Sequence, residues 1–103
     1  MRIAPSPVIE LNRLVAVAMA DGPEAAYPGL AVLADPLDRY AYYHATRAEL
    51  LRRAGRPSEA AAAYARALPY CQNGIERRFV QRRLAELHSA RTAGGAKAAS
   101  DAD

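Results

Sequence analysis

The segment RAELLRRAGRPSEAAAAYARAL, residues 47–68, decides the fold because it encodes two helices joined by a tight turn. Small and apolar residues recur at helical spacing on both sides of Gly55-Arg56-Pro57. Glycine favours the end of the first helix, and proline suits the first turn of the second. Alanine, the residue with the highest helix propensity, dominates the second half of the segment. These features predict a helical hairpin.

The hairpin fits the pattern of a tetratricopeptide repeat, in which small residues mark the closest approach of two helices. When Ala48 is set at the small-residue position of the first helix, residues of the expected type follow at Leu51, Gly55, Ala60, Tyr64 and Ala67. Residues 8–34 resemble a second, degraded copy with Gly22 at its turn. The sequence therefore predicts an all-α fold of tetratricopeptide-like helical hairpins.

About five helices are expected along the chain. Ser6 suits the N-cap of a first helix that starts at Pro7 and stops at Asp21-Gly22-Pro23. The later helices are predicted over residues 28–34, 37–54, 57–71 and 75–91. The buried stripe of the last helix is predicted to contain Phe79, Val80, Leu84 and Leu87. Residues 1–6 are predicted to be a linker, residues 7–91 the repeat domain, and the small, polar residues 92–103 a disordered tail.

The residue inventory argues against an enzyme. His44 and His88 are far apart, and His44 is expected to be a core or interface residue and His88 a solvated one. Cys71 has no adjacent His or Lys that would lower its pKa, and no serine lies in a G-x-S-x-G motif. No glycine-rich phosphate loop precedes a helix. We therefore expect no catalytic residues, no cofactor and no metal site.

The single cysteine also excludes a disulfide framework and favours a reducing compartment. The chain shows neither a signal-peptide pattern nor a run of apolar residues long enough to span a membrane. A soluble, cytoplasmic protein without membrane contact is expected. Fourteen basic residues, thirteen of them arginine, stand against eleven acidic ones, so the chain carries a small positive charge.

The repeat pattern predicts a concave face that could take a peptide. In the second hairpin this face contains Tyr42, Glu49, Arg52 and Arg53, and in the first hairpin the same offsets give Asn12 and Met19. Glu49 and Arg53 are also spaced for an i,i+4 ion pair within one helix. These six residues form the predicted protein-binding face, for which core packing and solvated charge are the alternative interpretation.

A second candidate surface lies on the fifth helix, where Arg77, Arg78 and Arg82 form a basic patch. Such a patch could follow nucleic-acid phosphates. No aromatic residues interleave with these arginines, and the pattern is more typical of a solvated helix whose arginine stems cover apolar surface. Direct DNA binding is therefore not the expected function.

Four blocks of sequence occur in an order that resembles a known family: SPVIELNRLVAVAMADGP, YAYYHATRAELLRRAGR, EAAAAYARAL and NGIERRFVQRRLAEL. Together they resemble the C-terminal helical-repeat extension of a subgroup of extracytoplasmic-function sigma factors of bacterial RNA polymerase. The resemblance covers roughly residues 5–88. The chain departs from the family pattern at Tyr27-Pro28-Gly29, where an uninterrupted Ala/Leu helix is usual, and at Ala54, where Leu is usual.

The resemblance implies a regulatory or assembly domain that modulates transcription initiation through protein contacts, with the sigma-factor core regions or RNA polymerase as partners. The promoter-reading regions of such a factor are expected upstream, so this domain alone is not expected to initiate transcription. Two alternatives remain at this level: a free-standing helical-repeat adaptor that binds peptides, and a nucleic-acid accessory domain. An uncapped apolar face would also allow a homodimer.

Overall fold

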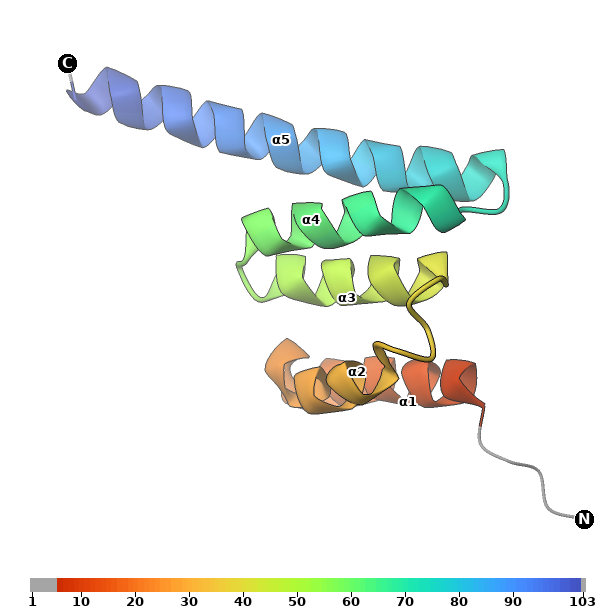
Figure 1. Ribbon diagram of the computed structural model, residues 1–103. Coiled ribbons are helices and arrows are strands. Elements are labelled where there is room, and N and C mark those ends of the chain that lie inside the picture. Colours follow the sequence, from red (N-terminus) through yellow and green to blue (C-terminus); the bar gives the residue numbers. More distant parts are fainter. Residues whose placement is uncertain (1–5, 103) are drawn as a thin grey trace, which may run out of the picture.

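The computed structural model describes the backbone of residues 6–102 and the side chains of residues 6–89. Every regular element in this part of the chain is helical, as the sequence predicts. The elements are α1 (Pro7–Asp21), η1 (Pro23–Ala26), α2 (Tyr27–Leu33), α3 (Ala41–Arg53), α4 (Pro57–Ala67), η2 (Leu68–Tyr70) and α5 (Gly74–Ala102), where η marks a short 3-10 helix. The α-helices stack in layers, with α1 and α2 at one end and α5 at the other (Figure 1).

The ends of α1 match the prediction. Ser6 is the N-cap, and its hydroxyl oxygen accepts a hydrogen bond of 3.2 Å from the backbone N–H of Val8. Gly22 ends the helix with φ 95°, a conformation that a side chain would disfavour. The part of the predicted linker before Ser6, residues 1–5, lies outside the described residues.

The second helix is formed in spite of Tyr27-Pro28-Gly29. Pro28 lies in its first turn, where proline loses no intrahelical hydrogen bond. Gly29 lies against the side chain of Leu14 on α1, so close that an added Cβ atom would be 2.5 Å from a Leu14 methyl carbon. The glycine therefore allows α1 and α2 to approach each other.

The predicted start of the third helix at residue 37 is wrong, because α3 begins at Ala41. Tyr40 has extended backbone angles, φ −116° and ψ 112°, so residues 37–40 form a turn in place of helix. Leu37 is nevertheless buried, and its backbone N–H donates to the carbonyl oxygen of Leu33. Leu37 is therefore buried like a core residue of a helix, although it lies in the turn before α3.

The hairpin of α3 and α4 carries the predicted repeat positions as expected. Gly55 has φ 77° at the turn, and Pro57 opens α4. The small residues of the pattern and the tyrosine between them are fully enclosed: Ala48, Ala60, Tyr64 and Ala67 are each 0% exposed, and Leu51 is 2% exposed. The fourth helix is shorter than predicted, because Pro69 changes its last turn to the 3-10 helix η2.

The fifth helix begins at Gly74 and has a reciprocal cap. The Asn73 side-chain oxygen accepts from the Glu76 backbone N–H at 2.8 Å, while the Glu76 carboxylate accepts from the Gln72 backbone N–H at 3.3 Å. The helical backbone continues to Ala102, past the predicted end at Arg91, and runs beyond the other helices in Figure 1. Its alanine-rich sequence explains the continuation. The disorder predicted for residues 92–103 stays a prediction about the tail in solution, where unpacked helix is marginal.

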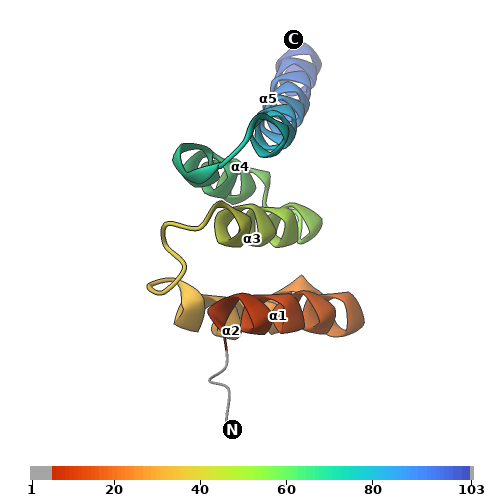
Figure 2. The same ribbon diagram turned by 90° about the vertical axis from the view of Figure 1, so that its right-hand side faces the viewer.

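Buried residues form two hydrophobic clusters. One joins α1, η1 and α2 to the inner side of α3 and includes Leu11, Leu14, Tyr43 and Leu50. The other is enclosed by α3, α4 and α5. Tyr27 packs against both clusters and links them. Figure 2 shows the order of the layers from the side, with α1 and α2 first and α3, α4 and α5 following.

Among the described residues, no helix combines the length and the apolar character needed to cross a membrane.

Candidate protein-binding groove

A groove lies along one side of the stack, where α1, α3 and α5 present their side chains. It consists of two adjoining hollows of about 380 and 270 Å³ that share Tyr42, Ala45 and Phe79 as lining residues. The larger hollow extends toward Tyr70 and Cys71, and the smaller one toward α1. We call the surface lined by these two hollows, which extends from Met19 on α1 to Glu76 on α5, the groove.

Four of the six residues of the predicted face line the groove (Met19, Tyr42, Glu49 and Arg53), and the other two, Asn12 and Arg52, hydrogen-bond to Tyr42 and Glu49. The Tyr42 hydroxyl donates a hydrogen bond of 2.7 Å to the side-chain oxygen of Asn12, which joins α3 to α1. A guanidinium nitrogen of Arg53 lies 3.0 Å from the sulfur of Met19, which makes a second link between the same two helices. Residues 30 or more positions apart in the sequence thus meet at the groove, as the repeat offsets predict.

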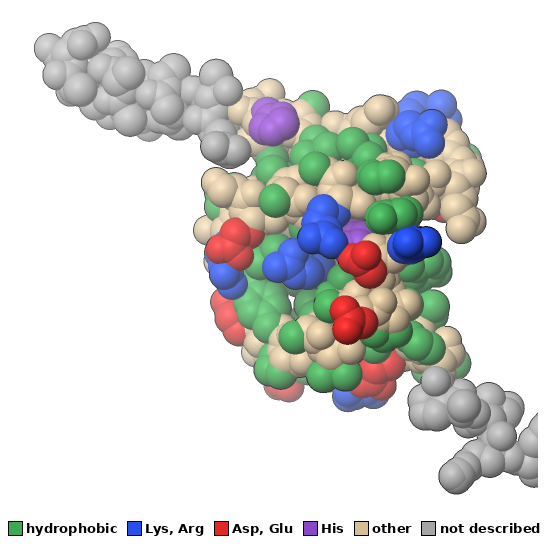
Figure 3. Space-filling view, viewed as in Figure 1, with side chains coloured by type: hydrophobic (Ala, Val, Ile, Leu, Met, Phe, Trp, Pro, Cys, Tyr) green, Lys and Arg blue, Asp and Glu red, His purple; other side chains and the backbone are tan. Residues whose placement is uncertain are grey.

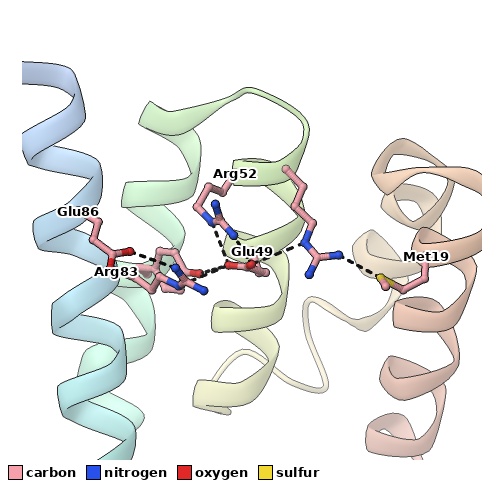
Figure 4. Close-up of polar contacts among 7 residues, drawn as sticks. Met19, Glu49, Arg52, Arg83 and Glu86 are labelled. Atoms are coloured by element: carbon pink, nitrogen blue, oxygen red, sulfur yellow. Dashed lines mark hydrogen bonds and ion pairs between the residues drawn. The ribbon is translucent and has the colours of Figure 1, made fainter. Parts of the chain in front are cut away.

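Glu49 is the centre of the polar contacts in the groove (Figure 4). Its carboxylate accepts hydrogen bonds from Arg52 at 2.5 and 3.1 Å and from the Tyr64 hydroxyl at 2.6 Å. Arg53 and Arg83 are ion-pair partners at 3.6 and 3.8 Å. The i,i+4 pair of Glu49 with Arg53 was expected, and the closer contact with Arg52 was not. One carboxylate therefore ties α3 to α4 and α5.

These contacts change the ionisation of the half-buried Glu49 and of the buried Tyr64. The hydrogen bond from Arg52 lowers the pKa of Glu49 from 4.5 to about 2, against the opposing effect of burial. Burial and the adjacent Glu49 carboxylate raise the pKa of Tyr64 well above its usual range. Glu49 is therefore charged and Tyr64 neutral at any physiological pH, and the floor of the groove is a fixed polar network.

The predicted burial of Phe79 on α5 is wrong. The sequence places it in the buried stripe with Val80, Leu84 and Leu87, but its side chain is 39% exposed and lines both hollows. Val80 and Leu87 are buried and Leu84 is half-buried. The Arg83 guanidinium carbon lies 5.4 Å from the centre of the Phe79 ring, a cation–π contact. The i,i+4 spacing of Phe79 and Arg83 was the available signal for this pair.

Two residues that contact Glu49 were not recognised from the sequence. Arg83 was not singled out there, yet it is an ion-pair partner of Glu49 at 3.8 Å. Tyr64 was assigned to packing alone, whereas its hydroxyl is the buried donor to Glu49. Both contacts depend on how α4 and α5 pack against α3, and sequence spacing within one helix does not reveal them.

The predicted basic patch on α5 remains on the surface. Arg77, Arg78 and Arg82 are all exposed. Within the described part of the chain their side chains make no ion pair. None of the three lines the groove. The patch is thus a separate surface, and its proposed contact with phosphates stays a prediction.

The histidines and the cysteine occupy the positions expected for structural residues. His44 is 3% exposed and donates through Nε2 to the Asp38 carbonyl oxygen at 2.5 Å, while His88 is exposed. Cys71 is buried, and burial raises the pKa of its thiol. No group of three His, Cys, Asp or Glu side chains in the described range is placed to hold a metal ion.

An uncharacterized protein of Rhizobium meliloti (strain 1021) is 42% identical to the chain over 86 residues. The aligned part is 84% of this chain and 20% of that relative, so the chain spans about a fifth of the relative's length. No family model matches the sequence, and no solved structure matches it.

Proposed function

We propose that the chain is a non-catalytic protein-interaction domain that uses the groove to regulate a larger transcription initiation factor. The observation that carries this proposal is the exposure of Met19, Tyr42 and Phe79 along one groove, at 66, 42 and 39%. Exposed methionine and aromatic side chains beside arginines are typical of protein-binding surfaces. Arg53 and Arg83 of the Glu49 network contact Met19 and Phe79, and Asn12 holds the Tyr42 hydroxyl, so these side chains are positioned before a partner binds and the entropic cost of binding is lower.

The regulatory role follows from the resemblance to the C-terminal extension of an extracytoplasmic-function sigma factor. The alignment with one fifth of the Rhizobium protein supports a domain that occurs as part of longer chains. The partners under this proposal are the sigma-factor core regions or RNA polymerase. A free-standing peptide-binding adaptor would use the same groove, so only the identity of the partner separates the two functions.

The test is capture of purified RNA polymerase, and separately of sigma core regions, by the immobilised 103-residue chain. A groove variant, Met19→Glu combined with Phe79→Ala, changes two exposed side chains of the groove and retains Glu49 with its hydrogen-bond donors Arg52 and Tyr64. Val32→Glu is the matched control because Val32 is an apolar residue 76% exposed on α2, outside the groove. We expect wild type and Val32→Glu to capture at least one component and the groove variant to lose it.

Capture that survives in the groove variant would move the contact to another surface. If the wild-type chain captures neither component, the transcription proposal is wrong and the adaptor is the better description. Binding to nucleic acid through α5 predicts a different response, a steep loss between low and physiological salt that Arg77→Glu, Arg78→Glu and Arg82→Glu would abolish.

A further inference from the structure

Another hollow lies on the side of α3 away from the groove. It measures about 490 Å³ and is bounded by α2, α3 and α4. Leu30, Ala31, Ala34 and Leu51 supply apolar wall. Figure 3 shows arginine side chains gathered in the middle of this face, with acidic side chains beside them. A hollow of this size that combines apolar wall with charged side chains can take a small molecule.

The positive and negative side chains that line this hollow are unequal in number. It is lined by three arginines and two carboxylates. Arg66 pairs with Asp38 at 2.8 Å, and Arg56 pairs with Glu59 at 2.6 Å. Both carboxylates are therefore already engaged by arginines. The third arginine, Arg47, is half-buried, and within residues 6–89 its side chain makes no hydrogen bond or ion pair.

Two other polar residues in the wall of the hollow, Tyr43 and His44, already have hydrogen-bond partners of their own. The hydroxyl of Tyr43, on the wall of the hollow, donates to the Leu30 carbonyl oxygen at 2.8 Å. His44 donates to the Asp38 carbonyl oxygen, so its ring nitrogen Nε2 is also in use. Because the two carboxylates of the hollow are already paired with Arg66 and Arg56, the guanidinium of the half-buried Arg47 would gain a charge-assisted partner from an anion supplied from outside.

We propose that this hollow binds a small organic carboxylate, with the carboxylate on Arg47 and its apolar part against Leu30 and Leu51. One unmatched guanidinium corresponds to one negative charge, and its planar fork fits a carboxylate in a bidentate manner. The apolar walls favour a ligand with a hydrocarbon portion over a bare inorganic anion. This site is separate from the groove and does not depend on the function proposed for it.

The experiment is a titration of the ¹⁵N-labelled 103-residue chain with sodium hexanoate, followed by amide chemical shifts at constant ionic strength. Hexanol and hexylammonium have the same hydrocarbon chain without the negative charge. Inorganic phosphate has the charge without the chain. We expect saturable shifts at Ala31 and Leu51 with hexanoate, and much weaker effects with the other three probes.

Arg47→Gln should weaken hexanoate binding about 10- to 100-fold, as expected for loss of a charge-assisted hydrogen bond. Arg82→Gln is the control and should bind as wild type does, because Arg82 is exposed on α5 and does not line the hollow. Ala31→Phe is a second variant that places a ring at the exposed wall residue and should block binding without removing a buried contact.

Several results would overturn the proposal. These are the absence of saturable shifts, shifts confined to other surfaces, equal binding of hexanol, tighter binding of phosphate, and wild-type affinity in Arg47→Gln. If Arg47→Gln does not fold, the decision passes to Ala31→Phe, for which undiminished hexanoate binding would be equally decisive against this hollow.

Discussion

Replacement of Glu49 by glutamine tests the polar network at the floor of the groove. The native pKa of Glu49 is about 2 in place of 4.5, because Arg52 and Tyr64 hydrogen-bond to the charged form. A group whose pKa is lower in the folded state stabilises the fold above its unfolded pKa, and this stabilisation is lost as the pH falls through the folded pKa. Glu49 therefore stabilises the chain at neutral pH and ceases to do so in acid.

The size of this contribution follows from the pKa difference. It amounts to at most about 3 kcal/mol at pH 5 and above, about 1.5 kcal/mol near pH 3 and about 0.5 kcal/mol near pH 2. The Glu49 side chain is 22% exposed, so solvent screening is limited. Glu49→Gln keeps the shape of the side chain and can still accept a hydrogen bond from Tyr64, which isolates the effect of the charge.

The assay is urea unfolding of both proteins at a series of pH values from 7 to 2. We expect the difference in unfolding free energy between wild type and Glu49→Gln to be largest at neutral pH and to shrink mainly between pH 4.5 and 2. Glu10→Gln is the matched control, because Glu10 also pairs with an arginine, Arg13, at 2.5 Å but on an exposed helix surface. Its pH profile should stay close to that of wild type, since solvent screens that pair.

Parallel pH profiles for wild type and Glu49→Gln would refute the reasoning. They would mean that the carboxylate has no preferred partners in the folded state, and that the ties from α3 to α4 and α5 at the groove are not formed. A pH-dependent loss in Glu10→Gln as large as in Glu49→Gln would show that arginine pairing alone, without burial, produces the effect.

Three further predictions concern the packing of the fold. Gly29→Ala should lower the unfolding free energy by about 1 kcal/mol, because overpacking against Leu14 outweighs the gain in helix propensity. In a Leu14→Val background the same change should be neutral or stabilising. Urea unfolding that shows no such reversal would contradict the close approach of Gly29 to Leu14. Ser6→Ala should cost about 1 kcal/mol through loss of the α1 cap, whereas an unchanged melting temperature would show that the cap is unimportant. Cys71 should react slowly with a thiol reagent in the folded protein and rapidly in denaturant, since it is buried and its thiol pKa is raised; equal rates would place the thiol at the surface.

The repeat pattern was sufficient to predict the second hairpin. Ala48, Ala60, Tyr64 and Ala67 are fully buried because their spacing reflects local helix geometry, which sequence periodicity reports directly. The same reasoning predicted the shared face of Asn12, Met19 and Tyr42, since the offsets within one repeat recur in the next. The hairpins and the position of the groove could therefore be read from the sequence.

Details that depend on tertiary packing could not be read in this way. The helical start predicted at residue 37 failed because a turn residue, Leu37, is buried as well as a helical residue would be. Phe79 was assigned to the core because it is apolar and adjacent to Val80, but the packing of α5 on α4 leaves its ring at the groove. The charge imbalance at Arg47 likewise appears only when three helices are placed together.

The division of the buried residues into two clusters has a consequence for binding. The groove crosses from α1, in one cluster, to α3 and α5, which belong mainly to the other. Local opening of the first hairpin would remove Asn12 and Met19 while the rest of the repeat stayed folded. A partner bound along the full groove would contact both the first hairpin and the rest of the repeat. It would raise the free energy of opening the first hairpin by its own binding free energy. Slower amide hydrogen exchange in α1 would then show that a partner occupies the groove, although α1 forms only one edge of it.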